Sequence, residues 1–233
     1  MPADLGGRTI LVTGASRGIG RACALEAAAR GADLVLVART RGALEEVDDL
    51  VRARGRHATL VVLDLRDGAK LDALGASLFQ RRRQLEGLIH AAGTLTDLTP
   101  VAHLDPARLL DLVTVHALAA QRLLRTLFPL LAGADRARAV FLTDRQGRNA
   151  AYWGHYAAGK AALEQIVRAF AAETRGTAIR TSLVDPGPVA TGLRRVAFPG
   201  GGLAAERQPE EVAVGIVDQL DPDREPRLDL RLD

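Results

Sequence analysis

The chain has 233 residues, of which 48% are apolar and 25% are charged, and its formal net charge is +3. These proportions are ordinary for a globular protein, and the length predicts one domain, residues 1–233, with a large core. The arginines are scattered among acidic residues and only 3% of the residues are aromatic. The composition therefore argues against a nucleic-acid-binding surface.

The single cysteine, Cys23, excludes an intramolecular disulfide and offers no zinc cluster. One free thiol fits a reducing compartment. The N-terminal segment has no signal-peptide pattern, and the longest apolar runs are far shorter than a membrane span. We therefore expect a cytoplasmic protein with no membrane partner and no bound metal.

Short apolar runs alternate along the chain with segments of helical periodicity. The predicted strands are Thr9–Thr13, Leu34–Val37, Thr59–Leu63, Gly87–His90, Ala139–Leu142 and Ile179–Val184. Each run is apolar on both faces, as buried parallel strands are. The pattern predicts an α/β fold in three layers, a doubly wound parallel sheet with helices on both faces.

The first predicted strand runs into a glycine-rich turn that opens a helix. Gly14, Gly18 and Gly20 have the spacing G-x-x-x-G-x-G. The first glycine allows the tight turn, and the other two let the backbone approach a pyrophosphate at the helix N-terminus. A strand before the glycines and a helix after them are the context that a dinucleotide site requires.

The end of the second predicted strand bears on the choice of nucleotide. NAD-selective sites place an acidic residue there to bind the ribose 2′-hydroxyl, whereas this chain has Arg39 and no carboxylate. Arg39, helped by Arg17 in the glycine loop, suits a 2′-phosphate. The sequence therefore favours NADP(H), the alternative being two solvated arginines in an arginine-rich chain.

A tyrosine and a lysine four residues apart open the last long helical segment. Lys160 is one of only two lysines among 31 basic residues, so an arginine-rich chain has a compact ammonium here. The spacing puts Lys160 and Tyr156 on one face of a helix. A nearby ammonium favours the ionised phenol and lowers its pKa from about 10. The pair therefore predicts a tyrosine acid or base, unless the two residues share a surface helix by chance.

Five motifs occur in the order and spacing of a known family. They are TGASRGIG at Thr13–Gly20, Asp64-Leu65, Ala91–Gly93, Tyr156-x-x-x-Lys160 and PGPVAT at Pro186–Thr191. The chain thereby resembles the short-chain dehydrogenases/reductases over nearly its whole length. The resemblance implies a single-domain Rossmann fold and hydride transfer between NADP(H) and a small-molecule carbonyl or alcohol.

The resemblance also assigns roles to residues. Tyr156 would be the general acid in carbonyl reduction or the base in alcohol oxidation, and Lys160 would hold the nicotinamide ribose and lower the pKa of Tyr156. Asp64 would contact the adenine. With the glycine loop and the two arginines, the expected coenzyme-binding residues are Gly14, Ser16, Arg17, Gly18, Ile19, Gly20, Arg39, Asp64, Leu65, Ala92, Gly93, Tyr156, Lys160, Pro186, Gly187, Val189 and Thr191.

The chain departs from the family pattern at two catalytic positions. The family serine that polarises the substrate carbonyl lies 13 residues before the tyrosine, and Thr143 stands there. Alignment on Gly147 instead places Asp144 at that position, where a carboxylate would raise the pKa of the tyrosine; we expect Thr143. The family's relay asparagine aligns with His116, which either relays a proton or is a core histidine.

The segment Pro188–Pro209 is rich in glycine and proline, and we expect a substrate lid there whose apolar covering is Leu193, Val196, Phe198 and Leu203. The sequence of the C-terminal tail does not show where the last strand lies. Family members are usually homodimers or homotetramers built on helices that fall here at Pro106–Leu131 and Tyr156–Arg175. Two other readings stay open: an NADP(H)-binding sensor with a decayed site, and a reductase of acyl chains held by a carrier protein.

Overall fold

The computed structural model describes residues 3–201 and 206–232. Its centre is a seven-stranded sheet in the order β3-β2-β1-β4-β5-β6-β7, in which every neighbouring pair is parallel. The strands are β1 Thr9–Thr13, β2 Asp33–Ala38, β3 Ala58–Val62, β4 Gly87–His90, β5 Ala137–Leu142, β6 Ile179–Asp185 and β7 Leu230–Arg231. This is the predicted doubly wound Rossmann fold, and its strand order reverses between β1 and β4.

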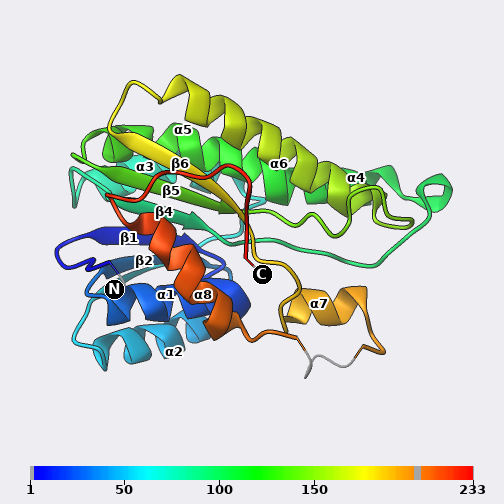
Figure 1. Ribbon diagram of the computed structural model, residues 1–233, viewed down its shortest axis with the longest axis horizontal. Coiled ribbons are helices and arrows are strands. Elements are labelled where there is room, and N and C mark those ends of the chain that lie inside the picture. The colour runs from blue at the N-terminus through cyan, green and yellow to red at the C-terminus, as the bar shows by residue number, and fades with distance from the viewer. Residues whose placement is uncertain (1–2, 202–205, 233) are drawn as a thin grey trace.

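Helices cover both faces of the sheet. They are α1 Gly18–Ala29, α2 Arg41–Arg52, α3 Gly68–Phe79, α4 Pro106–Val113, α5 Ala119–Ala132, α6 Gly154–Glu173, α7 Gly192–Ala197 and α8 Pro209–Val217. Figure 1 shows α1, α2 and α8 on one face of the sheet and α3, α5 and α6 on the other. None of the helices in the described ranges is long and apolar enough to cross a bilayer.

Each face of the sheet has its own core, made almost entirely of Ala, Leu, Val and Ile. Small residues bring neighbouring helices of one layer close together: a Cβ on Gly75 of α3 would lie 1.9 Å from the carbonyl oxygen of Thr126 in α5. The core therefore compensates for its few aromatic rings by close helix contacts.

The predicted strands lie where the apolar runs are, with two informative differences. β5 begins at Ala137, earlier than predicted, because Arg138 pairs with Gly87 of β4 and donates to the carbonyl of Pro222. The sequence of the tail did not show where the last strand lies; in the structure it is β7, which pairs with the end of β6 through Leu230. β3 is only half-buried because it forms the edge of the sheet.

The two long helices also differ from the expected ranges. The first is continuous from α4 to α5, but a π-helical turn, Thr114–Leu118, joins them. The second, α6, begins two residues before Tyr156. A π-turn inside an α-helix often marks a functional site, and this one carries His116.

The expected lid contains ordered structure. It includes α7 and a bridge between Val189 and Arg207. Leu203, one of the expected covering residues, lies outside the described residues. Figure 1 shows α7 beyond the end of the sheet, separate from the two helical layers. This position puts α7 over the carboxyl edge of the strands.

Candidate active site

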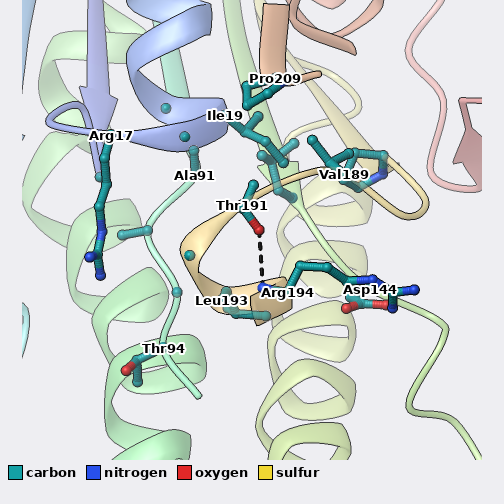
Figure 2. A pocket seen from close by; sticks show the side chains of 18 of the residues that line it. Arg17, Ile19, Ala91, Thr94, Asp144, Val189, Thr191, Leu193, Arg194 and Pro209 are labelled. Carbon is teal, nitrogen blue, oxygen red and sulfur yellow. Dashed lines mark hydrogen bonds between the residues drawn. The ribbon is translucent and has the colours of Figure 1, made fainter. Parts of the chain in front are cut away.

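A pocket of about 500 Å³ opens at the carboxyl ends of the central strands, beside the reversal of strand order. In open parallel sheets, ligands bind at this position. All the expected coenzyme-binding residues line it, as does Thr143, whereas His116 does not. Figure 2 shows Arg17 at one side of the pocket and Asp144 at the other, with Thr191 and Leu193 between them.

The glycine loop lies against the loop that follows β4. Gly14 has φ +69°, and a Cβ there would lie 2.9 Å from Cα of Ala92. A Cβ on Gly20 would lie 2.3 Å from the carbonyl oxygen of Gly14. The backbone therefore approaches this closely only because neither residue has a side chain.

Helix α1 points its N-terminus into the pocket. It begins at Gly18 after Arg17, which gives no side-chain cap, and its first turn has no acidic residue. The first N–H groups of a helix have no partner within the helix and favour an anion. The cradle thus fits the pyrophosphate of a dinucleotide.

The opposite end of this groove carries the arginine that the sequence analysis assigned to a 2′-phosphate. Arg39 follows β2, and its Nη1 lies 3.9 Å from Oδ2 of Asp64. Both side chains are exposed, at 59% and 41%. A pair this exposed contributes little stability, so the Arg39 guanidinium is available to a ligand.

Tyr156 and Lys160 lie on one face of α6 and are both buried. Lys160 Nζ donates to the carbonyl oxygen of Leu142 at 3.1 Å and lies 5.9 Å from the centre of the Tyr156 ring. Burial lowers the pKa of Lys160. Lys160 is thus anchored at the end of β5, beside the tyrosine, as its spacing predicted.

The residue that touches the tyrosine hydroxyl is Asp144. The Tyr156 hydroxyl donates to Asp144 Oδ2 at 3.1 Å, and Asp144 Oδ1 accepts from the Gln146 backbone N–H at 2.8 Å. Thr143 instead donates its hydroxyl to Glu164 Oε1 at 2.5 Å. The structure thus places Asp144, the alternative from the alignment on Gly147, at the tyrosine hydroxyl, while Thr143 lines the same pocket and contacts Glu164.

This contact reverses the expected pKa of the tyrosine. Burial first, and then the negative charge of Asp144, raise the pKa of Tyr156 well above its usual value of 10. The Lys160 ammonium does not overcome these effects. The phenol is therefore protonated at neutral pH in the described structure.

His116 lies behind the tyrosine. Its ring meets that of Tyr156 edge to face at 5.3 Å, and its Nε2 accepts from the Thr94 backbone N–H at 3.1 Å. Burial holds the pKa of His116 well below its usual 6.5, so the ring is neutral. His90 is also buried, with Nδ1 2.9 Å from Thr13 Oγ1.

Comparisons with known proteins agree on the family to which this site belongs. A family model described as short chain dehydrogenase matches residues 8–200. The uncharacterized oxidoreductase YciK of Escherichia coli K12 is 34% identical over 199 residues, 84% of this chain and 79% of the relative. An NADP-dependent 3-hydroxy acid dehydrogenase of Schizosaccharomyces pombe is 30% identical over 205 residues, 87% of this chain and 79% of the relative.

The structural comparison points the same way. A short chain dehydrogenase from Shigella flexneri 2a, complexed with NADP, has a TM-score of 0.91 at 29% identity and covers 99% of this chain and 98% of its own. The chain belongs to the short-chain dehydrogenase/reductase family. It is therefore an oxidoreductase of that family.

The sequence analysis missed several residues of this dehydrogenase pocket. Trp153 and Gln146 also line it, together with Leu193 and Arg194 of the expected lid. Trp153 is the only tryptophan of a chain with few aromatic residues, and its position three residues before Tyr156 was a signal that could have found it. Gln146 had no such signal, because it reaches the pocket only through the path of the loop after β5.

Proposed function

We propose that the protein is an NADP(H)-dependent oxidoreductase that interconverts a carbonyl compound and an alcohol. The observation that carries the proposal is the meeting of Tyr156 and Lys160 with the glycine loop in one pocket. The NADP complex of the Shigella flexneri relative and the NADP-dependent relative from Schizosaccharomyces pombe support the choice of coenzyme. When bound, the reduced nicotinamide supplies a hydride.

The chain's own residues would hold the coenzyme along the pocket. The N–H groups at the start of α1 would bind the pyrophosphate. Arg39 and Arg17 would bind the 2′-phosphate through charge-assisted hydrogen bonds, with Asp64 at the adenine. Val189 and Thr191, at the far side of the glycine loop, would orient the carboxamide.

Tyr156 would act on the substrate oxygen as an acid. Since its pKa is raised, its hydroxyl is protonated at neutral pH, which suits proton donation during carbonyl reduction. Lys160 would stabilise the phenolate that remains, because its ammonium lies near the ring. His116 stays a proposed relay residue, held behind Tyr156 rather than in the pocket.

The direct test of this role is Tyr156→Phe. We expect NADPH to bind with unchanged affinity while the reduction of ketones, aldehydes and 3-oxoacyl thioesters falls by at least about 100-fold, because general acid catalysis contributes this much. NADPH oxidation followed by absorbance measures the rate, and fluorescence titration measures binding. An unimpaired variant would refute the assignment.

The coenzyme preference has a separate test. Arg39→Ala should weaken NADPH binding by about ten-fold or more and leave NADH binding unchanged, since only NADPH carries the 2′-phosphate. The matched control is Arg41→Ala, an exposed arginine that lies 3.9 Å from Glu45. Equal binding of NADH and NADPH by the wild-type protein would overturn the NADP(H) proposal.

A second candidate function is an NADP(H)-binding sensor that no longer turns over a substrate. The Asp144–Tyr156 contact favours it, because a carboxylate beside the tyrosine opposes the negative charge that forms on a carbonyl oxygen. It predicts tight NADPH binding and no turnover of any compound. The Tyr156–Lys160 pair, buried and anchored, supports the enzyme instead.

We also propose the assembly and setting of the protein. Leu110, Leu118 and Phe128 expose apolar side chains along the α4–α5 segment, which supports a homodimer or homotetramer built on this face. Cys23 is a buried free thiol, which supports a cytoplasmic location. We treat residues 1–233 as one domain because one sheet joins the two halves.

A further inference from the structure

Asp144 is a carboxylate without a cation in contact with it at the reacting end of the pocket. Among the ion pairs of the described residues, none involves Asp144; its charge acts on Lys160, whose ammonium donates to the Leu142 carbonyl. Glu164, which accepts from the adjacent Thr143, is paired with Arg148, whereas Asp185 acts together with Asp144 on Tyr156 and Lys160. The Asp144 carboxylate therefore leaves a negative charge beside the Tyr156 hydroxyl.

This negative charge disfavours the reduction of a neutral carbonyl and favours the binding of a cation. Hydride addition to a ketone produces an alkoxide, and a carboxylate a few ångströms away raises the energy of that anion. Hydride addition to an iminium ion instead converts a cation to a neutral amine. A carboxylate stabilises the iminium form, and no proton has to be delivered after the hydride.

We propose that Asp144 is the anchor of a subsite for a positively charged nitrogen, and that the protein reduces iminium ions. The inference rests on the hydride transfer proposed above and extends it to a second acceptor class. One iminium ion and one NADPH give one tertiary amine and one NADP⁺. The iminium carbon gains a hydrogen with two electrons, the π electrons of its double bond become the nitrogen lone pair, and NADPH is oxidised.

Aromatic side chains lie beside the tyrosine that Asp144 contacts. Trp153 lies edge to face with Tyr156 at 5.6 Å between ring centres, and Phe198 of the α7 end lies 5.9 Å from Trp153. Aromatic faces attract cations. One cation already contacts such a ring: the Arg194 guanidinium lies 4.0 Å from the centre of the Phe198 ring.

Arg194 does not cancel the charge of Asp144. Figure 2 shows the two side chains on the same side of the pocket, but Arg194 is held by other partners. Its Nε lies 2.6 Å from Glu206 Oε1, and its Nη1 lies 2.6 Å from Gln146 Oε1. Arg194 is thus held by Glu206 and Gln146, and Asp144 stays available to a ligand.

The two classes of hydride acceptor depend on different residues. Reduction of a ketone needs the proton of Tyr156, whereas reduction of a permanently charged iminium needs only the charge of Asp144. Asp144→Asn removes the charge and keeps an oxygen that accepts from Tyr156. Asp144→Ser is a second neutral variant in case the first does not fold.

Binding without turnover is the first readout. Calorimetric titration uses the unreactive N,N-dimethylpyrrolidinium cation against the full protein with and without NADP⁺. We expect binding to the wild type and to Tyr156→Phe, and a loss of about ten-fold or more in Asp144→Asn. Asp223→Asn, a remote surface variant that removes the partner of Arg136, should bind as the wild type does.

Turnover is the second readout, with substrates of matched size. The pairs are N-methylpyrrolinium with cyclopentanone and N-methyl-3,4-dihydroisoquinolinium with 1-tetralone, and a sample without protein corrects for direct reduction. We expect the wild type to reduce the iminium ions. Asp144→Asn should lose about ten-fold or more in kcat/KM through a raised KM, because the charge acts on binding of the cation, and Tyr156→Phe should stay within a few-fold of the wild-type rate with the iminium ions.

Each outcome decides between the proposals. Ketone turnover without iminium turnover, or iminium turnover whose kcat/KM Asp144→Asn leaves unchanged, overturns the cation subsite and leaves the carbonyl function standing. Iminium turnover without ketone turnover supports the subsite and removes the carbonyl function. NADPH binding without any turnover overturns both.

Discussion

Tyr156 lies between an ammonium and a carboxylate that act on its proton in opposite directions. Lys160 is near the ring, but it also donates to the Leu142 carbonyl, whereas Asp144 accepts the tyrosine hydroxyl directly. Burial adds to the effect of Asp144, so the pKa of Tyr156 rises. At the residue scale, the pKa of the proposed proton donor is therefore raised by the residue that only the alternative alignment put beside it.

The raised pKa has a measurable consequence. In a Tyr152→Phe background, Tyr156 is the only tyrosine, and its phenolate absorbance should appear only well above pH 10. Asp144→Asn should bring this transition to lower pH, because it removes a negative charge that opposes ionisation. An unchanged or higher transition in the variant would mean that Asp144 does not act on the phenol.

Sequence reasoning placed Tyr156 and Lys160 on one face of a helix, as the structure does, and favoured Thr143 over Asp144 as their neighbour. The choice of Thr143 counted residues back from the tyrosine, which assumes a loop of fixed shape. In this loop Asn149 and Tyr152 have positive φ values of 58° and 72°, a conformation that few side chains adopt. Its path cannot be read from spacing, and the observed contact matches the alternative alignment on Gly147.

At the scale of elements, the strands and glycine turn could be predicted because local patterns determine them. Buried parallel strands are apolar on both faces, and the turn requires glycine at close contacts. The two-residue strand β7 and the π-turn at His116 could not be predicted. β7 pairs with a strand distant in sequence, through Leu230 and Val184, and the π-turn changes the hydrogen-bond spacing of a helix without changing its apolar periodicity.

The glycine turn gives a prediction with an internal control. Gly14→Ala should destabilise the protein by about 1–3 kcal/mol, since it forces a side chain into a left-handed conformation and against Ala92. It should also weaken NADPH binding. Gly42→Ala, in exposed α2 with no atom near its new Cβ, should stabilise by up to about 1 kcal/mol.

Urea denaturation of the two glycine variants and of the wild type measures both effects. Equal stability of Gly14→Ala and the wild type would show that the close approach of the β1 and β4 loops is not required. It would also remove the physical reason given for the first glycine of the motif.

At the scale of the whole molecule, the parallel sheet explains why distant motifs form one site. The carboxyl ends of β1, β4, β5 and β6 lie on one edge, and the loops that follow them bring Gly14, Ala92, Asp144 and Gly187 to the same pocket. The motif order in the sequence predicts this edge. The negative charge of Asp144 at the reacting end of the pocket depends on the path of the loop after β5, so the structure was needed to place it.

The exposed apolar residues on the α4–α5 segment predict the assembly. The protein should elute as a dimer or tetramer in size-exclusion chromatography with light scattering. Phe128→Asp, which places a charge on a residue that is 41% exposed, should shift it toward the monomer. Phe79→Asp is the matched control, since Phe79 is similarly exposed at 37% on α3. A wild-type monomer would contradict the proposal.

The most direct test of hydride transfer is the fate of the hydrogen itself. NADPH that carries deuterium at both C4 positions is incubated with the protein and the carbonyl and iminium pairs, and the product is analysed by mass spectrometry. We predict one deuterium on the former double-bond carbon, with one NADPH consumed for each product. Bound NADPH that is never consumed, or consumed without deuterium in any product, would contradict the assignment as an NADPH-dependent reductase.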